Sequence, residues 1–125
     1  MFFSVPPCTP WSNRLLSVAA DADGARVDVV CGPVEDVARS HAPFDGFNLS
    51  DVFEYVDAAA AERMYAAVLE SARAGARLAY WNMLVPRRRP ERFASRVRSL
   101  DEAARALHAR DRAFFYSAFV LEVVA

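Results

Sequence analysis

Residues 44–55 decide the fold, and they read FDGFNLSDVFEY. The segment from Phe44 to Leu49 carries the large apolar residues Phe44, Phe47 and Leu49, and it predicts a strand. Asp51 stands three residues before Glu54, and this spacing predicts a reciprocal cap at the start of a helix. The stretch is therefore predicted to be a strand that passes through a polar turn into a helix, as in α/β proteins.

The same alternation continues on both sides of this stretch. We predict strands at 27–31, 44–49, 76–82 and 114–123, and helices at 33–41, 58–74 and 100–108. Because the strands are apolar on both faces, we expect a sheet that helices cover on both sides.

Several residues predict where the helices begin and end. Asp57 is expected to cap the helix at 58–74, and Gly75 to end it in a left-handed conformation. Ser99 and Glu102 predict a capping box for the last helix. Residues 93–97 suggest a further short helix before it.

Composition narrows the class of protein. The 125 residues carry a formal net charge of -1, which argues against nucleic acid as a partner because phosphate binding needs a basic surplus. Cys8 and Cys31 lack metal-ligand spacing, and His41 and His108 are single histidines on predicted helix faces, so we infer no metal site. The first residues lack the basic region of a signal peptide, and no apolar run is long enough to span a bilayer. We therefore expect a cytoplasmic protein, with residues 1–25 as an extended arm and residues 26–125 as the α/β domain.

Polar side chains gather where the predicted strands end. In parallel sheets ligands bind outside the carboxyl ends of the strands. The candidates there are Asn48, Ser50, Asp51, Glu54, Asn82 and Arg87. Two interpretations stay open for each group. Ser50 and Asp51 either meet a ligand or only cap a helix, and the arginines at 87–89 either meet an anion or only keep a loop solvated.

Residues 44–55 resemble the central signature of the betaine-lipid-synthase family, and so do residues 75–87, GARLAYWNMLVPR. This family includes S-adenosylmethionine:diacylglycerol 3-amino-3-carboxypropyltransferases. The resemblance extends over about residues 26–125. It implies the carboxyl-terminal part of a class I methyltransferase-like domain, that is, a partial Rossmann-like three-layer sandwich around a mostly parallel sheet of about four strands.

The resemblance also implies S-adenosylmethionine as the cofactor and transfer of its 3-amino-3-carboxypropyl group to a lipid hydroxyl. In such a reaction the protein mainly aligns the partners and helps to remove the hydroxyl proton. Position and chemistry suggest Asp51 or Glu54 as the catalytic base. They further suggest Asn48 and Ser50 as cofactor contacts, and Asn82 and Arg87 as substrate contacts.

The glycines depart from the pattern of this family. The cofactor-binding half of such a domain opens with a strand and a glycine-rich turn, whereas the four glycines here stand at 24, 32, 46 and 75. We therefore expect the chain to be inactive alone. It should form a homo-oligomer or bind a chain that supplies the missing strands, and it should approach the membrane periphery only through a lipid substrate.

Two alternatives remain. One is a non-catalytic remnant that acts as a binding or assembly subunit. The other is a small-ligand-binding protein that uses a cleft around Asn48 and Asn82.

Overall fold

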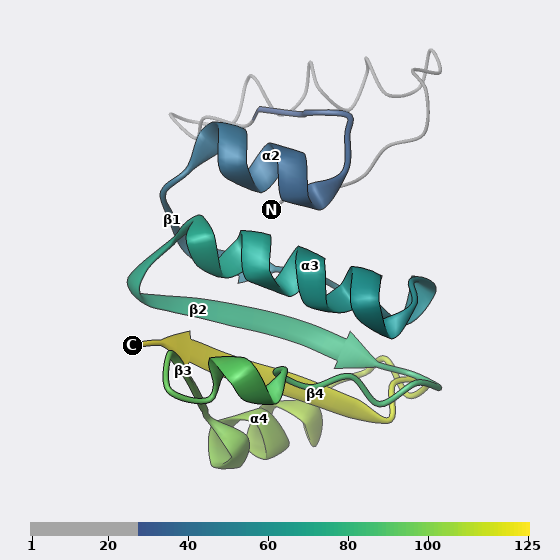
Figure 1. Ribbon diagram of the computed structural model, residues 1–125. Coiled ribbons are helices and arrows are strands. Elements are labelled where there is room, and N and C mark those ends of the chain that lie inside the picture. The colour runs from purple at the N-terminus through teal and green to yellow at the C-terminus, as the bar shows by residue number, and fades with distance from the viewer. Residues whose placement is uncertain (1–27) are drawn as a thin grey trace, which may run out of the picture.

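The computed structural model describes residues 28–125, and the arm expected over residues 1–25 lies outside them, together with Cys8. Helices pack on a single open sheet (Figure 1). The elements in chain order are α2 (Val34–His41), β1 (Phe44–Asn48), the 3-10 helix η1 (Val52–Tyr55), α3 (Ala58–Glu70), β2 (Ala72–Asn82), the 3-10 helix η2 (Glu91–Phe93), β3 (Val97–Ser99), α4 (Asp101–His108) and β4 (Ala118–Val124).

The sheet has four strands in the order β1-β2-β4-β3. Only β1 and β2 are parallel, and α3 connects them as a βαβ unit. Strand β4 lies between β2 and β3 and is antiparallel to both. The predicted α/β class with four strands is confirmed. The prediction of a mostly parallel sheet is wrong, because β4 enters the sheet between β2 and β3 and runs antiparallel to both.

The strand predicted at 27–31 does not form over residues 28–31, the part of it that the structure describes. Residues 28–31 have no regular structure and lead directly into α2. Val29 is exposed, so the apolar run that suggested a strand does not pair with the sheet.

Helix α3 covers the core face of the sheet. Its stripe of Ala61, Met64, Tyr65, Val68 and Leu69 is buried together with apolar residues of β1, β2 and β4. Asp57 caps its first turn as predicted, because the side-chain Oδ1 accepts a 2.7 Å hydrogen bond from the N–H of Ala60. Such a cap satisfies a backbone donor that the helix itself leaves unpaired.

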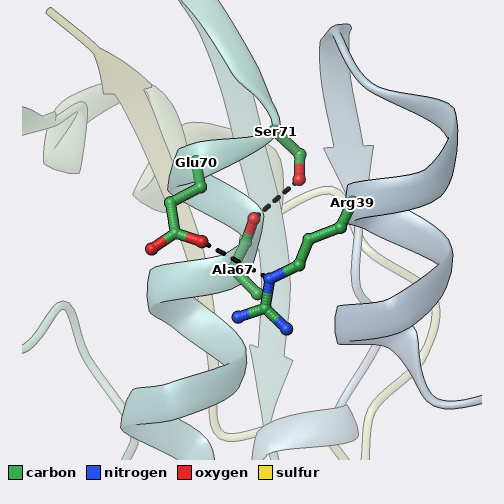
Figure 2. A network of polar contacts seen from close by, with 4 residues as sticks. All are labelled: Arg39, Ala67, Glu70 and Ser71. Atoms are coloured by element: carbon green, nitrogen blue, oxygen red, sulfur yellow. Dashed lines mark hydrogen bonds and ion pairs between the residues drawn. The ribbon is translucent and has the colours of Figure 1, made fainter.

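The end of α3 differs from the prediction. The helix stops at Glu70, and the Ser71 hydroxyl donates a 2.7 Å hydrogen bond back to the carbonyl of Ala67 (Figure 2). An ion pair of 3.4 Å between Arg39 and Glu70 joins α2 to the same turn. Gly75 does have positive φ, +81°, but it lies within β2, where the register against β1 shifts. Its conformation therefore belongs to this irregular part of the strand and not to a helix end.

The short helix suggested over residues 93–97 is displaced: the 3-10 helix η2 ends at Phe93, residues 94–96 form a turn and a strand begins at Val97. Residues 97–99 form β3 beside β4, and η2 precedes them. Helix α4 begins after Leu100 without a side-chain cap. The predicted capping box of Ser99 and Glu102 is therefore wrong, because Ser99 belongs to the strand.

Candidate functional site

All six candidate residues lie at one end of the sheet: Asn48 and Asn82 end β1 and β2, and the other four lie in the segments that follow these strands. The carboxyl end of β2 and the first residue of β4 meet there, since Asn82 pairs with Ala118 (Figure 1). The polar turn after β1 joins them, because the carbonyl of Ser50 accepts a 2.8 Å hydrogen bond from the N–H of Trp81. We call this end of the sheet the site end.

The turn at 48–51 is held by its own side chains. The Asn48 amide oxygen accepts a 3.2 Å hydrogen bond from the N–H of Ser50, and Ser50 adopts a left-handed conformation with φ of +50°. The Ser50 hydroxyl donates to Oδ1 of Asp51 at 3.2 Å. Asp51 makes no side-chain cap to η1, so the predicted reciprocal cap with Glu54 is wrong. The Asp51 carboxylate is directed to other partners instead.

Two tyrosine hydroxyls meet the Asp51 carboxylate. Tyr55 and Tyr116 both donate to Oδ2, at 3.3 and 3.5 Å. The negative charge of Asp51 and this hydrogen bond raise the pKa of Tyr55. Neither tyrosine was a sequence candidate. The spacing of four residues between Asp51 and Tyr55 could have indicated this contact. Tyr116 lies in the loop before β4, 65 residues from Asp51, and no sequence pattern links the two.

An aromatic surface extends from Tyr116. The ring of Trp81 lies 6.0 Å from Tyr116 and 4.7 Å from Phe119 between ring centroids. Its indole N–H donates a 2.9 Å hydrogen bond to Asp111. The N–H of Ala113 and this indole together lower the pKa of Asp111. Two carboxylates, Asp51 and Asp111, thus border a surface of aromatic rings, and such a combination attracts a cation.

Glu54 holds the loop after β2. Its two carboxylate oxygens accept hydrogen bonds from the N–H groups of Met83 at 2.8 Å, Leu84 at 2.9 Å and Val85. Partial burial raises the pKa of Glu54, but these three donors and the Arg87 charge outweigh it and lower the pKa overall. A carboxylate stabilised in this way is a poor proton acceptor.

Asn82 and Arg87 shape the same loop. The Asn82 side chain, 3% exposed, donates to the Arg87 carbonyl at 2.9 Å and accepts from the Arg87 N–H at 3.2 Å. The Arg87 guanidinium donates from Nε to the carbonyl of Phe53 at 3.0 Å and from Nη2 to that of Val56 at 2.7 Å. These bonds tie the loop after β2 to the segment after β1.

The arginines at 87–89 do not form one cationic surface. Arg88 is exposed and lies 4.0 Å from Asp101, and Arg89 donates to the carbonyl of Val97 from a half-buried position. Each of the three side chains is directed to a different neighbour. The sequence left two interpretations open, an anion site or a solvated loop. In the structure Arg87 and Arg89 instead bond to backbone carbonyls and so anchor the loop.

A cavity of about 240 Å³ lies between the start of α3 and the loop at 86–90. Its lining includes Phe53, Tyr65, Tyr80, Arg87 and Arg88. Neither Asn48 nor Asn82 lines it, so it is separate from the cleft expected around those two residues.

Over residues 28–125, no three His, Cys, Asp or Glu side chains are placed to hold a metal ion. The helices of this same range are too short or too polar to cross a bilayer. Comparison of the chain with protein-family models, with curated proteins and with solved structures finds no match.

Proposed function

We propose that residues 28–125 form the carboxyl-terminal part of a cytoplasmic, S-adenosylmethionine-dependent transferase domain of partial Rossmann-like architecture. The site end would hold the reacting groups, and the transferred group would be the 3-amino-3-carboxypropyl arm. The observation that carries the proposal is the position of Asp51, an incompletely buried carboxylate on the turn that follows the parallel strand β1.

The topology supports this placement. Ligands of open α/β sheets bind beyond the carboxyl ends of parallel strands. Here β1 and β2 form the parallel pair, and the turn at 48–51 follows the end of β1 directly. Fold alone does not define a reaction, so the chemistry of the residues must carry the rest.

The charges at the site end suit S-adenosylmethionine. Its sulfonium and ammonium groups are cations, and cations are stabilised by carboxylates and by the faces of aromatic rings. Asp51 with Tyr55 and Tyr116 provides the carboxylate and two rings, and Trp81 beside Tyr116 extends the aromatic surface. Asn48 and Ser50 of the same turn would supply further polar contacts.

Asp51 is the better of the two candidate bases. The bond from the acceptor oxygen to the carbon beside the sulfonium would form as the bond from that carbon to sulfur breaks, and methylthioadenosine would leave. Asp51 would take the hydroxyl proton, because Glu54 already accepts three backbone N–H groups. Asn82 and Arg87 would then act by positioning the loop beside the acceptor and not by touching it.

A second chain would complete the sheet. Among the described strands β1 pairs with β2 alone, and an unpaired strand edge can accept a further strand. We propose that another copy of this chain, or a separate protein, supplies strands beside β1. Sedimentation at micromolar concentration should show an oligomer, and a strictly monomeric species would contradict a homo-oligomer.

Calorimetry with two ligands tests the cofactor proposal. The full 125-residue chain should bind both S-adenosylmethionine and methylthioadenosine. Asp51→Asn should weaken binding of S-adenosylmethionine by about tenfold, which corresponds to about 1.4 kcal/mol. It should weaken binding of methylthioadenosine less, because this neutral thioether lacks the sulfonium charge.

Asp45→Asn is the matched control for that experiment. Asp45 lies on β1, the strand that precedes the turn of Asp51, and makes an exposed ion pair with Arg73. Such pairs contribute little. This variant should bind both ligands like the wild type. Equal losses for the two ligands in Asp51→Asn would contradict the proposed charge recognition.

A second candidate is a non-catalytic binding or assembly subunit. It is favoured by one observation: the side chains of Glu54, Asn82 and Arg87 all bond to backbone groups of neighbouring loops. Absence of binding of both ligands, together with an oligomer in sedimentation, would favour this reading over the transferase.

A further inference from the structure

Large apolar side chains are exposed at the site end. Within residues 28–125 seven large hydrophobic residues are exposed, and five of them lie on three segments that meet there: η1, the loop after β2 and the loop before β4. Phe114 is 93% exposed, Leu84 84% and Tyr55 74%, and Val85 and Phe115 complete the set. We call these five residues the apolar tip.

Hydrogen bonds hold the three segments together. Glu54 binds the N–H groups of Leu84 and Val85, and Asp51 joins Tyr55 to Tyr116. The rings of Phe114 and Phe115 lie 5.7 Å apart, and Phe115 lies 4.5 Å from Tyr116. The apolar tip is therefore one surface built from three separate parts of the chain.

Exposed apolar groups that gather in one place mark an interaction surface. Here the most exposed of them, Leu84 and Phe114, project from loops and not from a flat helix or sheet face. Side chains of this kind can enter a soft medium without a partner of matching shape. Aromatic residues are also the ones that favour the interface between water and hydrocarbon.

Two arginine side chains beside the tip can pair with an anionic surface. Arg110 and Arg112 are exposed on the loop that carries Phe114 and Phe115. The intervening Asp111 bonds to the indole of Trp81 and to the N–H of Ala113. Arginines next to apolar side chains add electrostatic attraction to anionic lipids.

We propose that the apolar tip, with Arg110 and Arg112, docks this protein on the surface of an anionic lipid bilayer. Phe114 and Leu84 enter the headgroup region, and the two arginines pair with lipid phosphates. The proposal stands on the exposed side chains and does not depend on the transfer chemistry. Where both hold, docking places Asp51 next to the bilayer.

Flotation with vesicles tests this docking without S-adenosylmethionine, so its result is independent of the transferase proposal. The full chain should float with vesicles of 70% phosphatidylcholine and 30% phosphatidylglycerol, and bind pure phosphatidylcholine vesicles more weakly. The double variant Phe114→Ser, Leu84→Ser should lower the partition coefficient by at least about tenfold, given the apolar area that it removes. Replacement of Arg110 and Arg112 by Gln should lower it roughly fivefold per residue on the anionic vesicles alone.

Two matched variants serve as controls, and circular dichroism confirms that each variant is folded. Phe114→Trp keeps a large aromatic group and should retain wild-type binding. Arg77→Gln removes an exposed charge in the middle of β2, five residues before Asn82, and should change nothing.

Three results would overturn the proposal. The first is absence of flotation, and the second is unchanged flotation of the Phe114→Ser, Leu84→Ser variant. The third is a wild-type dimer that this variant converts to monomer without any vesicle binding, because the apolar tip would then be a protein interface.

Discussion

The hydroxyl of Tyr65 in α3 donates a 2.7 Å hydrogen bond to the carboxyl group of Glu122 in β4, and both side chains are buried. Tyr80 of β2 lies near the same carboxyl, and burial together with the Glu122 charge raises its pKa. Its own buried hydroxyl has no hydrogen-bond partner within residues 28–125. Two tyrosines in one core thus differ in whether their polar atom is paired.

This difference predicts opposite results for two identical substitutions. Tyr65→Phe should lower the free energy of unfolding by about 1–3 kcal/mol, because it leaves a buried carboxyl without its donor. Tyr80→Phe removes an unpaired hydroxyl and should be close to neutral or stabilising. Urea denaturation followed by circular dichroism measures both, and equal losses in the two variants would contradict the assignment.

Glu122 should make stability depend on pH. Burial raises the pKa of Glu122, although the Tyr65 hydroxyl and the Arg89 charge oppose this shift. The folded state then holds the proton more tightly than the unfolded state. The contribution of Glu122 to stability is therefore present below its unfolded pKa, and it is lost as pH rises from there through the folded pKa.

Glu122→Gln removes this titration and keeps an acceptor for Tyr65. The difference in unfolding free energy, variant minus wild type, should increase as pH rises above about 4.3, the ordinary pKa of Glu. Urea denaturation of both proteins from pH 4 to 8 isolates the contribution of Glu122, because the contributions of all other titrating groups cancel in the difference. A difference that stays constant or falls over this range would show that Glu122 is not destabilised by burial.

The parts of the fold that could be predicted are those with local causes. Helix α3 has a buried stripe at helical spacing, and Asp57 caps it through a bond to a residue three positions away. Strand β3 could not be predicted, because it has only three residues and is defined by its pairing with β4. The direction of β4 is likewise set by neighbours and leaves no trace in the hydrophobic pattern.

The sequence predicted at which end of the sheet the polar candidate residues lie, but not which groups their side chains bond to. The polar turn after β1 does lie at the end of a parallel pair. The position of Glu54 in the sequence suggests a base, but its partners are the N–H groups of residues 83–85, about 30 positions away. A hydrogen bond to a distant backbone group carries no sequence signal, so its effect on Glu54 became visible only in the folded chain.

Glu54 should stabilise the loop after β2. Glu54→Ala leaves three backbone donors without their acceptor and should lower the free energy of unfolding by about 1–2 kcal/mol. Amide exchange of Met83, Leu84 and Val85 should become faster, because their N–H groups lose protection. Glu70→Ala, which breaks only the exposed ion pair with Arg39, is the control and should change stability by less than about 1 kcal/mol. Unchanged exchange at residues 83–85 would refute the anchoring role.

Ser50 should tolerate glycine better than any branched residue. Its φ of +50° lies in the left-handed region, which costs a residue with a β-carbon about 1–2 kcal/mol relative to glycine. Ser50→Gly relieves this cost but loses the hydroxyl bond to Asp51, so stability should rise by at most about 1 kcal/mol. Ser50→Val should destabilise the chain, because β-branched side chains are the least compatible with positive φ. Urea denaturation of the two variants measures the difference, and a valine variant as stable as the glycine variant would mean that the turn at 48–51 is not left-handed at Ser50.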